Sequence, residues 1–348
     1  MSEKNAARVL IVGQGLAGTA LGLELERAGV PFAIASDGHA RAASMAAAGL
    51  VNPVQGQRFV KVWRVEELLP LAERWYRETG AAVGAELWHP LQLRRLFANE
   101  TEAARAARKL ACGELTGFAS ALAGGEGLHI YGAAWVDLPA LLTRAAQRWR
   151  ARGVLREARV TREDLQTDAA GVTWQGERFG AVVLCVGAGT LVREFFPELR
   201  FEAAKGEIVH VSGAELPVGH AVSGGKWAIA DAPGQARVGA TYEHGVEDWA
   251  PTAAAREVLL EAARALVPGN LAVRAQRVGV RVSLPDRLPV AGWRDGVRIG
   301  VFGALGSKGT LFAPWMARRW SEVLAGATSG WPDALSVVRR AADVSRET

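Results

Sequence analysis

Three glycines near the N-terminus, Gly13, Gly15 and Gly18, have the spacing G-x-G-x-x-G where an apolar run gives way to a helical pattern. In such a turn the first glycine permits a tight bend, the second lets the backbone approach a pyrophosphate, and the third lets helix and strand pack closely. The first N–H groups of the helix, at Leu16 and Ala17, then face the phosphates. The chemistry that these residues offer is the binding of a dinucleotide.

The elements around this turn form a strand, a helix and a second strand. Apolar residues predict a strand over Val9–Val12, a helix over Leu16–Ala28 that ends at Gly29, and a strand over Phe32–Ala35. This context, within about 30 residues, favours a nucleotide-binding turn over a glycine-rich turn without a ligand.

The acidic residue that normally binds the ribose at the end of the second strand is missing. Ser36 stands at its place, and Asp37 follows one residue later. Either Asp37 reaches the ribose or Ser36 makes a weaker hydrogen bond, and we expect Asp37 or a backbone contact to replace the acid. NADP is not indicated, because no arginine follows until Arg41.

Length and composition indicate a globular protein. The chain has 348 residues, 49% apolar and 22% charged, which suits two domains or one large composite unit. The formal net charge is +5. Because the basic residues are dispersed, many of them in 144–152 and 318–340, they are typical of solvent-facing helix sides and we expect no nucleic-acid partner. An anionic substrate or cofactor is the alternative explanation of the charge.

Cysteine content and hydropathy point to the compartment. Cys112 and Cys185 are far apart and lack metal-ligand spacing, so we expect reduced thiols and no metal site. The apolar stretch after Arg8 is interrupted by glycines and runs into charged residues, unlike a signal peptide. No apolar run reaches about 18 residues. We therefore expect a cytoplasmic protein without a membrane span.

A second strand with a glycine-rich end lies in the middle of the chain. "FGAVVLCVGAGT", residues 179–190, is a continuous apolar run followed by Gly187 and Gly189. Such a run is typical of a central parallel strand, and its end, with Val186, would return the chain to the nucleotide. The alternative is an ordinary core strand and turn.

These patterns predict an α/β fold with a Rossmann-like nucleotide-binding domain and an interleaved, strand-rich α+β substrate domain. We expect the nucleotide-binding domain to comprise 1–52, 127–204 and 279–348. The substrate domain would comprise 53–126 and 205–278.

Taken in order, several segments resemble the FAD-dependent oxidoreductases of the D-amino-acid oxidase superfamily, which includes glycine oxidase, sarcosine oxidase and D-amino-acid dehydrogenases. Besides the turn at Gly13, the segments are "SMAAAGLVNP" (44–53), "VVLCVGAGT" (182–190), "AKGEIVHV" (204–211), "RVGATYE" (237–243), "GVRVSLPDRLPVAG" (279–292) and "VFGALGSKGTLFAPWMA" (301–317).

The resemblance implies FAD, with its ADP half on the first unit and its flavin between the domains. It implies noncovalent binding, because no Cys or His stands where covalent-flavin relatives attach the cofactor. A last loop would precede a helix that starts near Leu311. The further residues implied to contact FAD are Ser44, Ala47, Ala48, Gly49, Leu50, Val160, Val186, Gly187, Gly189, Gly306, Ser307, Lys308, Gly309 and Thr310.

The resemblance also implies roles in catalysis and substrate binding. Arg281 matches the family's carboxylate-binding arginine; the alternative is a structural arginine paired with Asp286. Lys308 would stabilise negative charge on the reduced flavin, or would be an exposed loop lysine. Tyr242 would line the pocket, or belong to an aromatic core.

Two features concern the substrate. Arg58 and Lys61, three residues apart, would form a charged patch for an anionic substrate; the alternative is a polar crossover with surface salt bridges. Ser307 and Lys308 stand where glycine-oxidase-like members carry an extra arginine. The resemblance therefore allows a substrate that is larger than glycine or is bound through Lys308.

The function implied is oxidation of the C–N bond of an amino acid or related amine by hydride transfer to flavin, with oxygen or a quinone or other carrier as electron acceptor. One alternative is a flavin-dependent tRNA-modification oxidase acting on an aminomethyl-type base. The basic charge suits it, but no basic block with interleaved aromatics appears and its partner methyltransferase domain has no counterpart here. A nicotinamide-only dehydrogenase and a flavin-binding protein without catalysis are the remaining alternatives.

Overall fold

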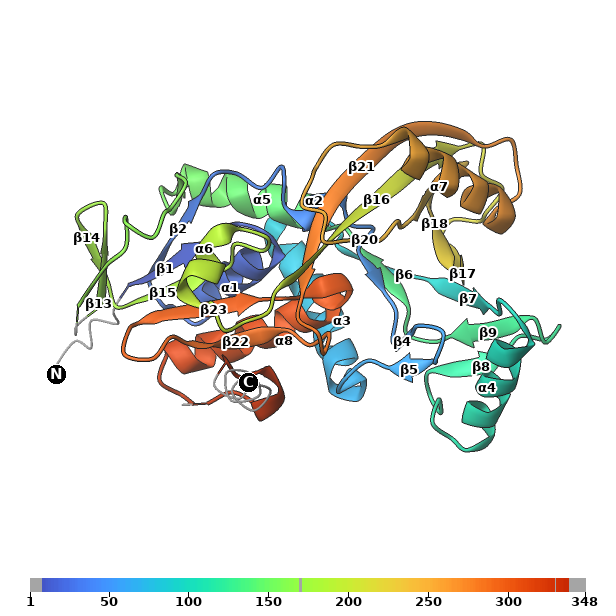
Figure 1. Cartoon of the computed structure of the whole chain (residues 1–348), viewed down its shortest axis with the longest axis horizontal. Coiled ribbons are helices and arrows are strands. Elements are labelled where there is room, and N and C mark those ends of the chain that lie inside the picture. Colours follow the sequence, from blue (N-terminus) through green and yellow to red (C-terminus); the bar gives the residue numbers. More distant parts are fainter. Residues whose placement is uncertain (1–7, 169–170, 329, 338–348) are drawn as a thin grey trace.

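The structure is a computed structural model that describes residues 8–168, 171–328 and 330–337. Figure 1 shows two layered parts side by side, one containing β1, β15 and β23 and the other containing β16, β21 and α7. Arg339 and Arg340, which belong to the basic run 318–340, lie outside the described residues. No helix in the described ranges is long and apolar enough to cross a membrane.

A six-stranded sheet forms the core of the first part. Its strands, in spatial order, are β11 (Leu155–Glu157), β2 (Phe32–Ser36), β1 (Val9–Val12), β15 (Ala181–Leu184), β23 (Ile299–Gly303) and β22 (Val290–Trp293). All neighbours are parallel except β22, which is antiparallel to β23. A mostly parallel sheet with β1 between β2 and β15 is the strand arrangement expected of a Rossmann-like domain.

Both faces of this sheet are covered, because side chains alternate along each strand. Val9 and Ile11 of β1 belong to a core shared with α1, α5 and α8, whereas Leu10 and Val12 belong to a core on the opposite face. The covering elements are α1 (Leu16–Arg27), α5 (Leu138–Ala151), α8 (Gly309–Leu324), α6 (Thr190–Phe195), β12 (Gln166–Asp168), β13 (Gly171–Trp174) and β14 (Glu177–Phe179). Burial on both faces explains why these strands are continuous apolar runs.

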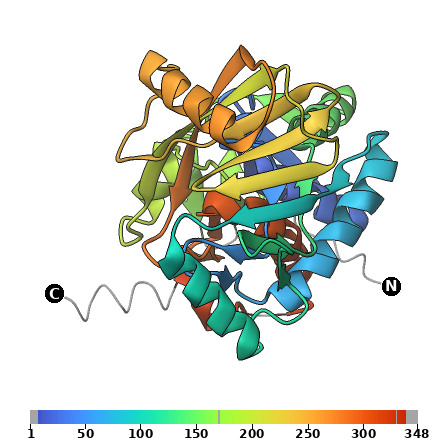
Figure 2. The same cartoon turned by 90° about the vertical axis from the view of Figure 1, so that its right-hand side faces the viewer.

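A nine-stranded sheet forms the second part, and Figure 2 views it with α7 above and α4 below. Its strands are β20 (Glu243–His244), β16 (Glu202–Ser212), β19 (Gln235–Gly239), β18 (Lys226–Ala232), β17 (His220–Gly224), β7 (Gln92–Leu96), β9 (Gly127–Ile130), β8 (Ala119–Ala121) and β21 (Ala272–Ser283), which pairs with β16. The helices are α7 (Ala253–Leu266) and α4 (Glu100–Ala111).

The remaining elements lie outside the two large sheets. They are α2 (Ala43–Ala46), the helix α3 (Val65–Val83), the three-stranded sheet β3 (Leu50–Val51), β10 (Ala134–Val136) and β6 (Trp88–Pro90), the hairpin β4 (Val54–Gln55) and β5 (Val60–Lys61), and two short 3-10 helices, η1 (Gly306–Lys308) and η2 (Asp333–Leu335).

The fold is the mixed α/β architecture expected from the sequence, with two local differences. Strand β9, at the start of the predicted nucleotide-binding segment 127–204, pairs with β7 and β8 in the nine-stranded sheet. Helix α8 begins at Gly309 rather than near Leu311, because the 3-10 turn η1 leads directly into it. The division of the chain into domain segments stays a prediction.

Candidate functional site

The carboxyl ends of the parallel strands in the six-stranded sheet meet at one edge. Gly13 follows β1, Ser36 ends β2, Val186 follows β15, and Ala304 follows β23. Ligands of open α/β sheets bind at this edge, outside the carboxyl ends of the strands. The predicted cofactor residues that follow these strands therefore share one side of the sheet.

The three glycines of the first turn are required for different reasons. A Cβ on Gly13, whose φ is +99°, would lie 2.6 Å from the Cys185 carbonyl oxygen, and a Cβ on Gly18 would overlap the Gly13 carbonyl oxygen. Gly15 differs, because its nearest neighbours would be the Ala42 Cβ at 3.7 Å and the Ser44 Oγ at 3.9 Å. Protein fills the space at Gly13 and Gly18 and leaves it free at Gly15.

The N-terminus of α1 opens into this free space. Gly15 is the N-cap residue and supplies no side-chain cap, and the first turn carries no acidic residue. The N–H groups of Leu16 and Ala17 have no intrahelical acceptor at this position. Together with the helix dipole, they form a site suited to an anion such as a pyrophosphate.

At the end of β2, Ser36 is buried, and its hydroxyl group takes part in a local turn. Its Oγ accepts from the Gly38 N–H at 3.2 Å, whereas Asp37 is exposed. His39, which the sequence analysis missed, contacts the Gln14 amide oxygen through Nδ1 at 2.5 Å. Burial, and secondarily the Arg150 charge, lowers the pKa of His39. Asp37 and His39 are therefore the polar side chains that directly follow the turn at the end of β2.

Val160 is close to this end. It is buried in the core on the face of β1 that carries Leu10 and Val12. The Ala158 N–H, two residues earlier, donates to the Ser36 carbonyl oxygen at 3.0 Å. On the other side, Gly187 has a φ of +57° and Gly189 is the N-cap residue of the short helix α6.

Three predicted cofactor segments converge on the start of α1. Ser44 lies beside Gly15, a Cβ on Gly309 would lie 3.3 Å from the Leu16 side chain, and Thr310 Oγ donates to the Leu50 carbonyl oxygen at 3.4 Å. The turn at Gly13, the stretch 44–50 and the start of α8 thus meet in space.

We call residues Ala43–Leu50 the flavin-side segment. At its centre Gly49 has a φ of +69°, and a Cβ there would overlap the Val136 carbonyl oxygen. The Gly49 carbonyl oxygen accepts from the Val136 N–H at 3.0 Å. The N–H groups of Ala48 and Gly49 have no acceptor within the described part of the chain. Two main-chain donors are thus available where the resemblance implies the flavin.

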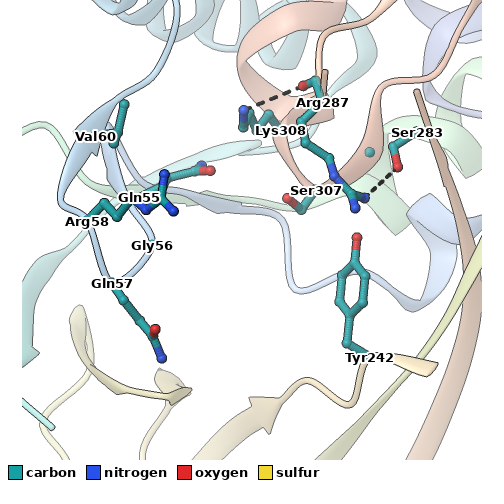
Figure 3. A pocket seen from close by; sticks show the side chains of 11 residues that line it. Gln55, Gly56, Gln57, Arg58, Val60, Tyr242, Ser283, Arg287, Ser307 and Lys308 are labelled. Atoms are coloured by element: carbon teal, nitrogen blue, oxygen red, sulfur yellow. Dashed lines mark hydrogen bonds between the residues drawn. The ribbon is translucent and has the colours of Figure 1, made fainter. Parts of the chain in front are cut away.

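A pocket of about 320 Å³ lies between the β4–β5 turn, the loop after β21 and the turn η1 (Figure 3). Tyr242 points from one side toward Arg287, while Gln55 and Arg58 extend from the β4–β5 turn on the other side (Figure 3). The lining residues are Gln55, Gly56, Gln57, Arg58, Val60, Tyr242, Ser283, Arg287, Gly306, Ser307 and Lys308.

Arg281 lies next to this pocket, on β21 opposite Ala204 of β16. Its guanidinium carbon lies 4.8 Å from the centroid of the Tyr242 ring, and it occupies the space where Gly206 lacks a Cβ. Its Nη1 is buried without a hydrogen-bond partner, and no ion pair to Arg281 occurs among the described residues. Burial lowers the pKa of this guanidinium, and the neighbouring Tyr242 opposes the shift.

Lys308 is half-buried in the pocket wall. Its Nζ makes one long hydrogen bond, of 3.5 Å, to the Arg287 carbonyl oxygen. Burial lowers the pKa of Lys308, and the charge of Arg287 lowers it further, whereas Asp286 acts in the opposite direction. Arg287, in turn, pairs with Glu202 at 3.2 Å and donates to Ser283 Oγ at 2.8 Å.

The predicted charged patch is divided. Arg58 lines the pocket, whereas Lys61 forms an ion pair with Glu66 and lies 5.4 Å from the Phe118 ring centroid. Arg287, Ser283 and the two glutamines also line the pocket and were not predicted from the sequence. Arg287 stands within the family-like segment 279–292, which was the signal available for it.

The sequence relationships agree with this arrangement. The bifunctional protein MnmC of tRNA 5-methylaminomethyl-2-thiouridine biosynthesis from Maricaulis maris is 34% identical over 332 residues, which are 91% of this chain. The chain spans about half the length, 52%, of that relative. Glycine oxidase from Pseudomonas aeruginosa is 28% identical over 352 residues, covering 92% of this chain and 95% of the relative.

A solved structure shows the same fold. The crystal structure of glycine oxidase from Geobacillus kaustophilus has a TM-score of 0.83 and 24% identity, and covers 94% of this chain and 97% of the other.

The model of the DAO family, described as FAD dependent oxidoreductase, matches residues 8–322, which include both sheets. A nicotinamide-only dehydrogenase does not agree with this match. The chain therefore belongs to the DAO family of FAD dependent oxidoreductases.

Proposed function

We propose that this chain binds FAD noncovalently at the edge of the six-stranded sheet and oxidises the C–N bond of an amine that carries a carboxylate. The observation that carries the proposal is Arg281, a buried guanidinium with an unpartnered Nη1 beside the pocket. A buried charge without a counter-ion is costly unless a ligand supplies one. A carboxylate fits best, because it accepts two parallel hydrogen bonds from a guanidinium.

The proposed FAD site is made of main-chain groups. The free space at Gly15 and the N–H groups of Leu16 and Ala17 would hold the pyrophosphate. The unpartnered N–H groups of Ala48 and Gly49 would face the flavin. Asp37 would hold the ribose, because Ser36 is engaged with Gly38.

The side chains around the pocket would orient the substrate. FAD, when bound, accepts a hydride from the carbon next to the amine nitrogen, which leaves an imine that water hydrolyses. Arg281 would fix the carboxylate and thereby the position of that carbon. Tyr242 would cover the guanidinium and exclude water from it. Lys308 would place positive charge beside the flavin, where the reduced ring carries negative charge.

Anaerobic reduction of the FAD-loaded protein tests this proposal. Glycine, sarcosine, and D- and L-amino acids are each compared with the corresponding amine that lacks the carboxylate, and loss of flavin absorbance is followed. We expect at least one acid to bleach the flavin while its decarboxylated partner does not. Equal bleaching by both members of every pair would contradict the carboxylate role. A yellow supernatant after acid precipitation would support noncovalent binding, whereas colour in the pellet would contradict it.

A second candidate function is oxidation of an aminomethyl-type group on tRNA. The relationship to MnmC over 91% of this chain favours it. The exposed side chains of Tyr242 and Val60 on the pocket wall would leave room for a base that extends outward. Anaerobic bleaching by tRNA bearing such a group, with no bleaching by any free amino acid, would favour this candidate over the first.

The electron acceptor is the remaining part of the proposal. Reoxidation of the reduced protein by oxygen is compared with reoxidation by a soluble quinone. Faster return of colour with oxygen would assign an oxidase, and faster return with the quinone a dehydrogenase.

A further inference from the structure

A buried arginine of the nine-stranded sheet reaches the flavin-side segment. Arg237 of β19 donates from Nη1 to the Ala48 carbonyl oxygen at 3.0 Å. Its guanidinium carbon lies 4.3 Å from the ring centroid of Trp135, and its side chain is only 8% exposed. Arg237 is therefore held on one face by an aromatic ring and makes its contact away from solvent.

Two carboxylates act on the charge of Arg237, Asp231 more strongly than Asp137. The Arg237 Nε lies 2.8 Å from Asp231 Oδ2, as an ion pair rather than an aligned hydrogen bond, and Nη2 has no partner. The Asp231 side chain is 25% exposed, three times as much as that of Arg237. The guanidinium thus retains an excess of positive potential on the side that faces Ala48.

The contact to Ala48 determines the direction of a donor. The Ala48 C=O and the Gly49 N–H belong to one planar trans peptide unit and point in opposite directions. Because Arg237 holds the oxygen, the Gly49 N–H points away from the guanidinium, and it has no acceptor in the described part of the chain. A charged donor on the oxygen also polarises the amide and strengthens its N–H as a donor.

A second arginine provides a comparison. Arg277 of β21 is exposed and donates from Nη1 to the Met45 carbonyl oxygen at 3.2 Å. The peptide unit of that oxygen carries the N–H of Ala46, which lies within α2. Arg277 thus contacts the flavin-side segment through a different peptide unit from the one that carries the free N–H group of Gly49.

We propose that Arg237 is a positioning residue that orients and polarises the Gly49 N–H toward FAD, so that it favours the reduced, more negatively charged flavin. This inference rests on the proposed binding of FAD at the flavin-side segment, but not on the identity of the substrate. The nine-stranded sheet would then tune the cofactor as well as hold the substrate.

The test is the flavin reduction potential, measured by equilibration with redox dyes, together with the FAD dissociation constant. For Arg237→Met we expect a roughly tenfold weaker preference for reduced over oxidised FAD, equivalent to a two-electron potential lower by about 30 mV. Asp231→Asn removes the stronger of the two carboxylates that act on the guanidinium and is expected to raise the potential. Arg277→Met is the matched control and should leave it unchanged.

The opposite signs separate tuning from a purely structural role. An unchanged potential in FAD-loaded Arg237→Met, or an equal fall in Arg277→Met, would overturn the inference. If Arg237→Met does not fold, Asp231→Asn decides alone: a rise supports the inference, and no change or a fall overturns it. A wild-type protein that binds no FAD would overturn the proposed function, and this inference with it.

Discussion

Two regions of the molecule differ in composition. One is the edge of the six-stranded sheet where the parallel strands end, which we call the nucleotide edge, and the other is the pocket beside the nine-stranded sheet. The edge consists of main-chain N–H groups and of glycines such as Gly15, where a side chain is missing. The pocket is lined by side chains from distant parts of the chain, among them the charged Arg58 and Lys308, and Arg281 lies next to it. The first region therefore depends on absent side chains and the second on the identity of those present.

This difference teaches that cofactor binding and substrate choice are separable by mutation. Adding a methyl group is expected to damage the edge, whereas changing a charge is expected to damage the pocket.

The nucleotide edge is most sensitive to an added methyl group at glycines where other protein atoms already fill the space. Gly18→Ala places a Cβ on the Gly13 carbonyl oxygen, so the turn must open. We expect a loss of about 3 kcal/mol in the free energy of unfolding, because overpacking of this kind costs that order of energy. Thermal denaturation of the apoprotein measures it. Gly15→Ala, at a glycine of the same turn whose Cβ would come no closer than 3.7 Å to another atom, is the control for a glycine-to-alanine change.

Gly15→Ala separates folding from cofactor binding at the same edge. The added Cβ would lie 3.7 Å or more from other atoms, so the apoprotein should unfold at the wild-type temperature. It would occupy the space proposed for the pyrophosphate, and we expect FAD affinity to fall at least roughly tenfold, or about 1.4 kcal/mol. Wild-type FAD affinity in fluorescence titration would show that the pyrophosphate does not lie at Gly15.

Lys308 gives the pocket a pH dependence. Its pKa is lowered, so the ammonium loses its proton at a lower pH than an ordinary lysine, and its stabilisation of the reduced flavin should weaken as pH rises through that value. We expect a several-fold alkaline loss of the preference for reduced over oxidised FAD, of about 1 kcal/mol. Lys308→Arg should abolish this loss between pH 7 and 10, because arginine does not titrate there. An unchanged alkaline loss in the variant would show that Lys308 does not cause it.

The smallest effect is expected on protein stability, from the ion pair between Lys205 and Asp248. Lys205 lies on the face of β16 opposite Ala204, the partner of Arg281, and its Nζ contacts Asp248 Oδ2 at 2.9 Å. The hydrogen bond from Lys205 lowers the pKa of Asp248. The stability that the pair contributes is therefore present above the ordinary Asp pKa of 3.8 and is lost as pH falls through the lowered value.

Asp248→Asn should lower the melting temperature of the apoprotein slightly at pH 7. The difference from wild type should shrink as pH falls below about 4. A difference that stays constant or grows in acid would contradict the role of this pair. FAD affinity should not change, since Asp248 contacts neither the nucleotide edge nor the flavin-side segment within the described residues.

The sequence predicts the nucleotide edge well because its signals are local. The helix expected over Leu16–Ala28 is α1, Leu16–Arg27, and the strand expected over Phe32–Ala35 is β2, Phe32–Ser36. Glycine spacing and apolar periodicity act within one β-α-β unit, where few tertiary contacts can override them.

The pocket is less predictable because its members meet only in the folded chain. Arg281, Tyr242 and Lys308 were identified through a family resemblance, whereas Arg287, with a φ of +61°, was missed. Spacing suggested that Arg58 and Lys61 act together, but Lys61 lies in β5 and pairs with Glu66. Sequence periodicity does not indicate which side chains of the β4–β5 hairpin point into the pocket.

Substitution of Arg281 provides the most direct test of the proposed substrate site. FAD-loaded Arg281→Ala is titrated anaerobically with the amino acid that reduces the wild type, beside Arg274→Ala, an exposed arginine on the same strand. We predict that half-reduction requires about 100-fold more substrate in Arg281→Ala, because a lost buried charge pair costs several kcal/mol, while FAD stays bound and Arg274→Ala behaves as wild type. Half-reduction of Arg281→Ala at the wild-type concentration would contradict the proposed substrate site.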